Sequence, residues 1–478
     1  MHLIDGDWTG SDVMSTSYNP ATGEALGQYA DGGAAEAQAA VAAARRAFDT
    51  TSWPRDRALR ARALLELADR FEARAGELAQ MLTKENGKTA FEAGAEAGSL
   101  SATLRHNAAQ AVTDVGAAAE AAPGVYFNTL LEPIGVAGII VPWNSPLALL
   151  IRSLAPALAA GCTVAVKLPG QTALTNKLIA EIVAETPSLP KGVVNIFTES
   201  GNTGAPFLVE SPDVDLISYT GSTKVGRQIA ATGAATLKRM GLELGGKSPM
   251  VVFDVADLDS TVPLLVAAIT MFTGQFCMAG SRVLVQRGVA DEIRERLRQM
   301  LSQVAVGPGD DPSTQMGPLI DKAAVERVDA FVEEASAYAK VIVRGGPVTE
   351  GPLAAGAFFR PAMLETDDLD VPLVQQEVFA PVLCFEVFDD EADALRRANA
   401  TEFGLAAAVF TRDTDRARRV GREIKAGTVW TNCWMVLNDA FEEGGFKQSG
   451  MGRLRGTRGI AEFQEVKTYV QVAPAQAG

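Results

Sequence analysis

The chain has 478 residues, more than one hydrophobic core usually serves, so we expect two large domains and a smaller element. Apolar residues make up 47% and charged residues 21%, as in ordinary soluble globular proteins. The 43 basic and 58 acidic residues give a formal charge of −15, which argues against nucleic acid or an anionic membrane as a partner. The apolar runs are too short, or too broken by Pro and Gly, to span a bilayer.

The cysteines and histidines limit the kinds of catalysis and metal binding to expect of this chain. The first residues, MHLIDGDWTG, lack a signal-peptide pattern, so we expect a cytoplasmic protein with reduced thiols. His2 and His106 lie away from the glycine-rich motifs, which disfavours histidine acid–base chemistry and leaves a carboxylate as the candidate base. No metal site is expected, because no metal-ligand spacing connects the four cysteines, Cys162, Cys277, Cys384 and Cys433.

The first third of the chain has helical periodicity. Residues 34–119 are rich in Ala, Glu, Arg and Leu, with apolar residues at helical spacing. This pattern predicts a set of amphipathic helices, interrupted at Trp53-Pro54 and Asn86-Gly87.

The pattern changes over residues 134–250, where short apolar runs alternate with stretches long enough for helices. That alternation predicts βαβ units and a parallel sheet covered on both faces. Asn144, Lys167 and Gly221 follow such runs, which puts them at the carboxyl edge, where open α/β sheets bind ligands. The GSTKVG turn at Gly221 should open a helix whose free N–H groups can bind a pyrophosphate, although it is not a GxGxxG fingerprint.

A second α/β alternation follows Gly246 and carries Cys277, which predicts a second doubly wound domain. The end of the chain, FQEVKTYVQV, is strand-like and has no following helix to cover it, so its edge invites pairing with another chain. The expected helices of this half lie near residues 257–273, 291–304, 321–339, 391–400 and 413–426.

Two short motifs, GLELGGKSP with Glu243 and GQFCMAGSR with Cys277, place reactive side chains among glycines and small residues. A thiolate can attack an electrophilic carbon, and a carboxylate can activate the thiol or a water molecule. Taken singly, Cys277 is better explained as a small buried residue and Glu243 as a structural ion-pair partner.

In order and spacing, these motifs resemble those of the aldehyde dehydrogenase superfamily, and the resemblance covers nearly the whole chain. It implies two doubly wound α/β domains, a variant Rossmann cofactor domain and a catalytic domain, plus a small β element that builds homodimers or homotetramers. The implied cofactor domain comprises residues 1–114 and 134–244, the catalytic domain 245–445, and the oligomerisation element 115–133 and 461–478. The further matching motifs are PWN at 142–144, the strand ending at Lys167, YTGSTKVG at 219–226, EVFAPV at 377–382 and GGFKQSGMGR at 444–453.

The resemblance implies that Cys277 adds to an aldehyde to give a thiohemiacetal, whose oxyanion the Asn144 amide and the Cys277 N–H stabilise. Hydride transfer to NAD(P) then leaves a thioester, which water activated by Glu243 hydrolyses. Relatives that pass the acyl group to coenzyme A generally lack a glutamate in this motif, so Glu243 favours release of a free acid.

The resemblance also implies the cofactor contacts. Many NAD-preferring relatives carry a glutamate where this chain has Gly170, so the position admits NADP and the preference stays open. The implied cofactor residues are Val141, Pro142, Trp143, Lys167, Gly170, Gly221, Ser222, Val225, Leu244, Glu377 and Phe379.

The expected substrate funnel is more polar than in relatives that oxidise simple aliphatic aldehydes. Arg152 can bind a carboxylate, as in semialdehyde dehydrogenases, or Glu443 can favour an amine, or the two can pair with each other or face solvent. Ser153 and Thr457 stand where relatives often carry a lysine and a glutamate linked to proton relay. The expected apolar walls are Leu149, Phe276, Met278 and Trp434.

Two other interpretations remain open. The Cys/Glu pair can act without a nicotinamide cofactor as an esterase or thioesterase, or the fold can serve as a catalytically silent binding protein. The presence of Cys277, Glu243 and Asn144 together argues against the silent protein.

Overall fold

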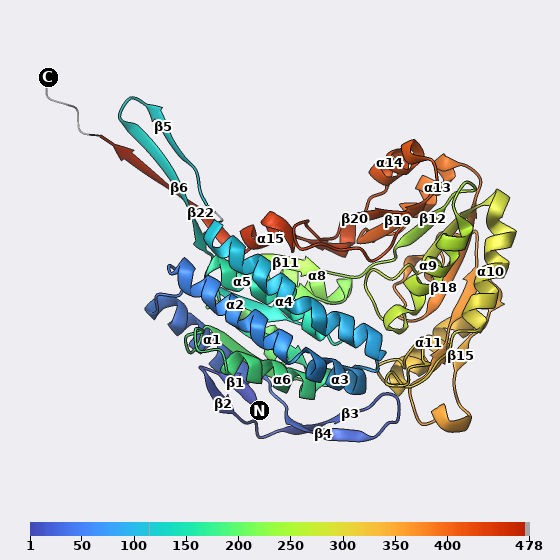
Figure 1. Cartoon of the computed structure of the whole chain (residues 1–478), viewed down its shortest axis with the longest axis horizontal. Helices are drawn as coiled ribbons and strands as arrows, with labels where there is room; N and C mark the ends of the chain where they lie inside the picture. Colours follow the sequence, from blue (N-terminus) through green and yellow to red (C-terminus); the bar gives the residue numbers. More distant parts are fainter. Residues whose placement is uncertain (114, 474–478) are drawn as a thin grey trace.

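The structure is a computed structural model that describes residues 1–113 and 115–473. Within these residues, two large sheets each carry helices on their faces, and a narrow sheet projects from the body (Figure 1). The predicted class, α/β with two doubly wound units and a small β element, is confirmed. Residues 114 and 474–478, which the segments expected from the sequence include, lie outside the described residues.

The first sheet has a parallel centre made of β9, β8, β7, β10 and β11, with β1, β2 and β21 added antiparallel at its two sides. The central strands are apolar because helices bury both faces. In spatial order the strands are β2 (Asp7–Thr9), β1 (His2–Ile4), β9 (Val194–Glu199), β8 (Thr163–Pro169), β7 (Val136–Ile140), β10 (Leu216–Thr220), β11 (Arg239–Glu243) and β21 (Gly450–Met451).

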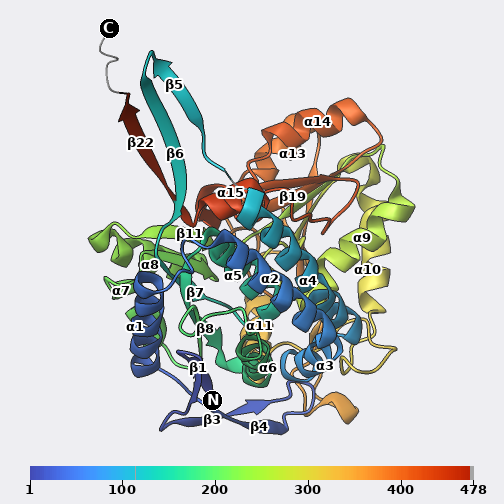
Figure 2. The ribbon, with the colours of Figure 1, turned by 60° about the vertical axis from the view of Figure 1, so that its left-hand side comes forward.

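Helices cover this sheet in layers (Figure 2). One face packs against α1 (Ala34–Thr50), α7 (Gly204–Glu210) and α8 (Thr223–Gly233). The other face packs against α5 (Pro146–Ala160) and α6 (Ala173–Ala184), and outside them lie α2 (Arg57–Ala73), α3 (Ala75–Asn86) and α4 (Ala90–Thr113). The breaks expected at Trp53-Pro54 and Asn86-Gly87 fall between helices, and Gly87 ends α3 with a φ of +83°. The helices stop at Thr113, short of residue 119, because the alanine-rich segment that follows pairs as a strand.

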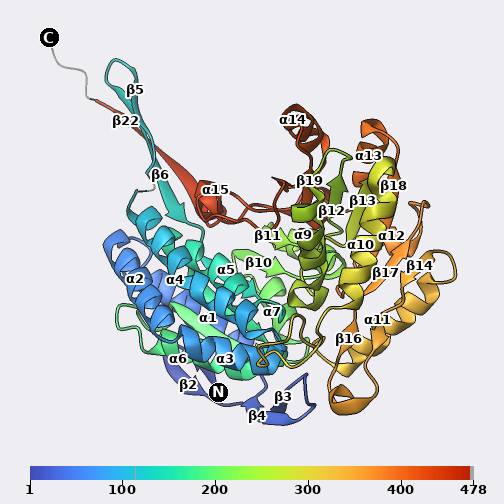
Figure 3. The same ribbon diagram turned by 45° about the vertical axis from the view of Figure 1, so that its right-hand side comes forward.

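The second sheet carries α9 (Leu258–Thr270) and α10 (Ala290–Ser302) on one face and α13 (Glu391–Ala398) and α14 (Thr414–Glu423) on the other (Figure 3). Together with α11 (Lys322–Ala335), these match the five helices expected after Gly246. A short helix, α12 (Pro372–Gln375), precedes Glu377. In spatial order the strands are β14 (Lys340–Val343), β17 (Ala362–Glu365), β18 (Val382–Phe388), β13 (Arg282–Gln286), β12 (Pro249–Val252), β19 (Ala406–Phe410) and β20 (Thr428–Thr431).

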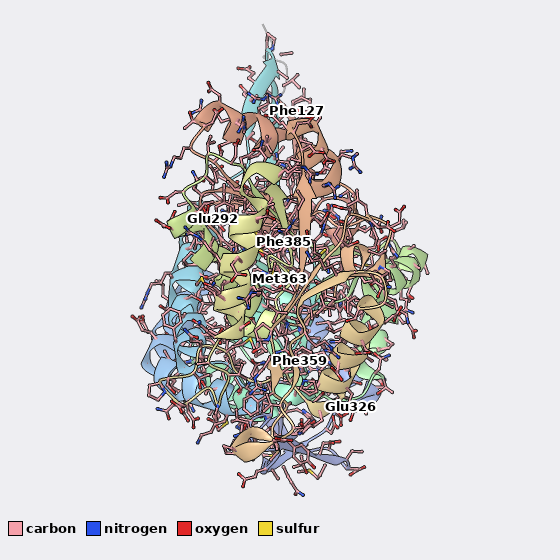
Figure 4. All side chains as sticks on the ribbon, turned by 90° about the vertical axis from the view of Figure 1, so that its right-hand side faces the viewer. Phe127, Glu292, Glu326, Phe359, Met363 and Phe385 are labelled. Atoms are coloured by element: carbon pink, nitrogen blue, oxygen red, sulfur yellow. The ribbon has the colours of Figure 1, made fainter. Side chains whose placement is uncertain are left out.

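Side chains of this half divide sharply between core and surface. Figure 4 labels Phe359, Met363 and Phe385, which are buried, whereas Glu292 on α10 and Glu326 on α11 are exposed. The apolar strand β12 belongs to this second sheet and not to the first, although the sequence pattern places it in the first alternation.

Several strands have no counterpart among the expected elements. Besides β1, β2 and β11, they include the hairpin β3 (Met14–Tyr18) and β4 (Ala25–Ala30) and the short pair β15 (Gly346–Pro347) and β16 (Phe359–Arg360). These strands are short or polar, so their apolar alternation is too weak to identify them.

The projecting sheet runs in the order β22 (Gln464–Val472), β6 (Val125–Pro133) and β5 (Ala118–Ala122), all antiparallel. It leaves the body next to the short helix α15 (Gly456–Ala461), as Figures 1 and 2 show. No helix within residues 1–113 and 115–473 is long and apolar enough to cross a membrane.

Candidate active site

Neighbouring strands of the first sheet bring chemistry-bearing residues to one edge. Lys167 lies near the carboxyl end of β8, and Asn144 follows the end of β7. β10 ends at Thr220, which stands opposite Glu243, the last residue of β11, and Gly221 follows directly. Because these strands are parallel and adjacent, their carboxyl ends meet at the same edge.

The turn after β10 opens α8, as its sequence predicts. The Ser222 side chain accepts a hydrogen bond from the Val225 N–H (3.3 Å) and so caps the helix. The Gly221 N–H donates to the carbonyl of Glu243 (3.0 Å). A Cβ at position 221 would lie 2.1 Å from the Tyr219 hydroxyl oxygen, so only glycine fits this close approach.

Lys167 and Gly170 lie on either side of the end of β8. Burial lowers the pKa of the half-buried Lys167, whose ammonium makes no hydrogen bond within the described part of the chain. A Cβ at Gly170 would lie 2.5 Å from the Tyr29 hydroxyl oxygen and 2.7 Å from the Ser200 Cβ. Introducing at Gly170 the glutamate of NAD-preferring relatives would therefore displace these neighbours.

On the opposite side of the edge, Glu377 accepts a hydrogen bond from the Gly246 N–H (3.0 Å). Burial raises the pKa of Glu377 to about 7. Trp143 and Phe379 meet edge to face with ring centroids 5.8 Å apart, and Phe379 adopts a φ of +55°, a conformation that costs a non-glycine residue energy. The segments around Asn144 and Glu377 are thus in contact.

The remaining expected cofactor residues fix the path of the backbone at this edge. Val141, which precedes Pro142, donates its N–H to the carbonyl of Lys167 (3.1 Å). Leu244 is buried against α8, where a Cβ at Gly226 would lie 2.5 Å from a Leu244 methyl carbon.

A cavity of about 690 Å³ opens beside Cys277. Five of the expected pocket residues line it, namely Leu149, Arg152, Phe276, Met278 and Glu443. Trp434 does not line it but supports its wall: its indole N–H donates to the Met278 carbonyl (3.2 Å), and its ring packs on Phe276 with centroids 6.1 Å apart. Further apolar walls come from Phe91, Met271, Phe272, Met435 and Leu437.

Cys277 is the cysteine that this cavity reaches; Cys162 and Cys384 are buried elsewhere in the cores. Burial raises the pKa of the Cys277 thiol to about 12, and the Arg152 guanidinium opposes that shift. A Cβ at Gly246 would lie 2.3 Å from the Cys277 carbonyl oxygen, so the chain that continues from Glu243 runs directly against the cysteine.

Glu243 is buried, and burial raises its pKa to about 8, against the opposing effect of Arg152. The Glu243 carboxyl therefore ionises close to neutral pH, the range that suits a general base. The buried Asn144 side chain donates one amide N–H to the carbonyl of Gln275 (3.1 Å), two residues before Cys277. An amide carries two N–H donors, so a second donor remains for a ligand.

Arg152 and Glu443 pair with each other, one of the alternatives that the sequence leaves open. Their side chains are only 4% and 6% exposed, and Arg152 Nη1 donates to Glu443 Oε1. Arg152 Nη2 donates to the Thr220 hydroxyl (2.9 Å), and Arg455 Nε donates to Glu443 Oε2 (2.9 Å). Burial disfavours ionisation of Glu443, yet the two guanidinium groups hold its pKa below the usual value. Arg455 also pairs with Asp439, which extends the chain of charges.

The two positions linked to proton relay do not line the cavity. The Ser153 hydroxyl accepts a hydrogen bond from the Ser218 hydroxyl (3.0 Å), and the Thr457 hydroxyl donates to Glu442 (3.4 Å).

The structure adds a polar wall that the sequence analysis missed. One face of α4 lines the cavity with Glu92, Glu96, Ser99, Thr103 and His106. The spacing of these residues, three or four apart, is the signal that would have identified them as one helix face. His106 thus lies beside the cavity although it is far from any glycine-rich motif.

Comparison with known proteins identifies the family. The model of the aldehyde dehydrogenase family matches residues 8–469. Aldehyde dehydrogenase 1 of Tanacetum cinerariifolium is 36% identical over 98% of this chain and 94% of its own length. Phenylacetaldehyde dehydrogenase of Pseudomonas fluorescens is 36% identical over 98% of this chain and 95% of its own length. Betaine aldehyde dehydrogenase of Staphylococcus aureus, solved in complex with NAD+, superposes with a TM-score of 0.96, at 33% identity over 99% of this chain and 95% of that one.

The matches span both sheets and the projecting element, so no large part of the chain lies outside the comparison. The chain therefore belongs to the aldehyde dehydrogenase family and oxidises an aldehyde with a nicotinamide dinucleotide.

Proposed function

We propose that the protein converts an uncharged aldehyde with an aromatic or long apolar side chain to its carboxylic acid, with Cys277 as nucleophile and Glu243 as the base for hydrolysis. The main support is the position of Cys277, which lines the cavity. Its carbonyl packs on Gly246, three residues after β11 ends at Glu243. A substrate in the cavity and a cofactor at the strand edge both reach the same sulfur.

The first half-reaction needs the thiolate. With a pKa of about 12, Cys277 is protonated at neutral pH in the ligand-free protein, so the thiol must give up its proton as sulfur attacks the carbonyl carbon. Glu243 is our candidate acceptor of that proton, and the charge of Arg152 favours the thiolate. The new carbon–sulfur bond leaves negative charge on the former carbonyl oxygen, which the second N–H of Asn144 and the Cys277 N–H stabilise. Loss of one such donor typically costs about 2.7–4 kcal/mol.

The strand edge fits a dinucleotide. The close-packed turn at Gly221 and the N-terminus of α8 can bind a pyrophosphate, and Lys167 offers an ammonium with no protein hydrogen bond. We assign Glu377, which accepts the Gly246 N–H, the role of accepting hydrogen bonds from the ribose hydroxyls, and Phe379 that of packing beside the nicotinamide. When bound, the nicotinamide would supply the acceptor for the hydride that leaves the thiohemiacetal carbon. Both NAD and NADP remain candidates at Gly170.

The second half-reaction uses Glu243 again. Once the proton taken from Cys277 has passed to solvent, the Glu243 carboxylate removes a proton from water, the water oxygen adds to the thioester carbon, and the carbon–sulfur bond breaks to release the acid and the Cys277 thiolate. A pKa of about 8 leaves Glu243 part ionised at neutral pH, so it can both accept and return a proton.

The proposed substrate class follows from the walls of the cavity. Besides the polar face of α4, whose Glu92 and Glu96 are bound by backbone N–H groups, the cavity has aromatic and aliphatic walls that suit an apolar substrate, and Phe272 and Phe276 meet edge to face at 5.4 Å. Glu443 balances the charge of Arg152, and Arg455 adds a second positive partner for Glu443, so neither side chain offers an uncompensated charge to a charged substrate group. We therefore expect uncharged aromatic aldehydes to be better substrates than aldehydes that carry a carboxylate or an amine.

We also propose that the protein is a homodimer or homotetramer joined through the projecting sheet. β22 is an edge strand with exposed apolar residues, the kind of edge that pairs with another chain. A reducing compartment such as the cytoplasm suits the four unpaired cysteines and a thiol nucleophile.

The proposal is tested with Cys277→Ser and Glu243→Gln. Cys277→Ser should lower turnover of phenylacetaldehyde at least about 1000-fold while NAD+ and NADP+ still bind, measured by steady-state kinetics and calorimetry. Glu243→Gln should accumulate a covalent acyl-enzyme, visible in the intact protein mass.

Full turnover by Cys277→Ser would contradict the covalent mechanism. The esterase alternative would instead be supported if the protein hydrolysed an ester without any nicotinamide cofactor and did not oxidise aldehydes.

A further inference from the structure

The segment before Cys277 has an unusual backbone. Phe272, Thr273 and Gly274 are consecutive residues with φ values of +52°, +56° and +67°. For Phe and Thr this left-handed conformation carries a steric cost, and the β-branched side chain of Thr increases that cost. Such a segment keeps its shape only if surrounding contacts hold it, and it leads directly to the proposed nucleophile.

The first turn of α4 supplies one of these contacts. Thr89 and Glu92 form a capping box: the Thr89 N–H donates to Glu92 Oε2 (2.9 Å), and the Glu92 N–H donates to the Thr89 hydroxyl (3.3 Å). The other carboxylate oxygen of Glu92 accepts the Phe272 N–H at 2.6 Å, across 180 residues of sequence. One buried carboxylate thus joins the start of α4 to the left-handed segment.

Lys88 and Glu96 add a second connection. They form an ion pair whose side chains are 1% and 3% exposed. The Lys88 ammonium also donates to the Ser145 hydroxyl (2.9 Å) and lies 4.0 Å from the centroid of the Phe272 ring. Ser145 follows Asn144, so the same cation touches both the oxyanion segment and the nucleophile segment.

Glu96 holds the helix that follows Asn144. Its Oε1 accepts the N–H groups of Leu147 (3.0 Å) and Ala148 (3.1 Å), in the first turn of α5. These donors have no partner inside the helix, and the carboxylate also complements the helix dipole. The position of Asn144 is therefore set from α4 as well.

We infer that Lys88, Glu92 and Glu96 are positioning residues, which hold the Phe272–Gly274 segment and the Asn144 segment together so that Cys277 and the Asn144 amide face one carbonyl group. The inference rests on the proposed role of Cys277. None of the three residues takes part in bond making, so they act on the rate of Cys277 chemistry and not on the affinity for the cofactor.

Glu92→Gln tests the inference. The two carboxylate oxygens of Glu92 accept the Thr89 N–H and the Phe272 N–H, whereas glutamine has a single acceptor oxygen and can replace only one of them. The matched control is Thr89→Ala, which removes a cap hydrogen bond and leaves the contact between Glu92 and Phe272 in place. A second variant, Lys88→Met/Glu96→Gln, removes the ion pair without leaving an unpaired buried charge.

The readouts are the pre-steady-state rate of nicotinamide reduction and the rate at which iodoacetamide alkylates Cys277, with Cys433 as internal reference. We expect Glu92→Gln and the double variant to lower both rates about 10- to 100-fold, with the Kd for NAD+ within twofold. Thr89→Ala should lower only the melting temperature.

Equal rates in Glu92→Gln and wild type, or equal losses in Glu92→Gln and Thr89→Ala, would overturn the inference. Because alkylation needs no catalysis, it remains informative even if Cys277→Ser contradicts the proposed mechanism.

Discussion

At the residue scale, the ionisation of Glu243 and Cys277 is set by a few neighbours. Burial raises both pKa values, to about 8 and about 12, and Arg152 opposes both shifts. A single buried guanidinium therefore adjusts the proposed nucleophile and the proposed base together. Removing its charge would make both groups harder to ionise.

The raised pKa of Glu243 predicts the pH dependence of hydrolysis. The carboxylate is the active form, so the rate of thioester hydrolysis should be low below pH 7 and rise with pH through about 8, reaching a plateau above it. The measurement is the single-turnover decay of the acyl-enzyme from pH 6 to about 9.5. A decay rate that does not change across this range would exclude Glu243 as the base.

At the element scale, buried charges tie separate segments together. Arg152 lies on α5, Glu443 and Asp439 lie in the segment after β20, and Arg455 precedes α15. A buried pair contributes little net stability, but removal of one partner leaves an uncompensated charge.

Glu443 keeps Arg455 as a partner, so Arg152→Met should reduce the free energy of unfolding by less than the about 3–5 kcal/mol typical of a buried charge left unpaired, and Arg152→Met/Glu443→Gln should recover part of that loss. Glu443→Gln alone removes the negative charge opposite Arg152, and we expect it to raise kcat/KM for a carboxylate-bearing semialdehyde relative to phenylacetaldehyde. Chemical denaturation and competition kinetics measure the two effects. Unchanged selectivity in Glu443→Gln would mean that Arg152 does not reach the substrate.

At the scale of the whole molecule, the projecting sheet stands apart from the two cores. β22 pairs with β6 over its full length, from Gln464 opposite Pro133 to Val472 opposite Val125, and its outer edge has no neighbour within the described residues. Exposed apolar side chains lie along it, including Val466, Tyr469 and Val470.

Val470→Lys, at a side chain 56% exposed, should weaken association by placing charge on this edge. We expect the variant to sediment as a smaller species than the wild type, with its secondary structure retained. Val255→Lys, at a side chain 43% exposed next to the second sheet, is a matched control that adds the same charge away from this edge. Identical sedimentation of Val470→Lys and wild type would mean that association does not use this edge.

The strongly periodic elements could be predicted from the sequence, because buried parallel strands and amphipathic helices have apolar patterns of their own. β7, β8 and the helices α1 to α4 are examples. By contrast, β11 reads RMGLE and β1 reads HLI, too polar or too short to signal a strand. They become strands because neighbours in the sheet satisfy their backbone groups, which is tertiary information.

Within the candidate site, the motifs around Glu243, Cys277 and Asn144 indicated the reaction class through their resemblance, in order and spacing, to those of aldehyde dehydrogenases. Only the tertiary structure decided between the alternatives for Arg152 and Glu443, because pairing depends on distance and burial rather than on residue type. It also brought Lys88 and Glu92 against a segment some 180 residues away in the chain. Contacts of that separation leave no periodic trace in a single sequence, because folding alone brings the two segments together.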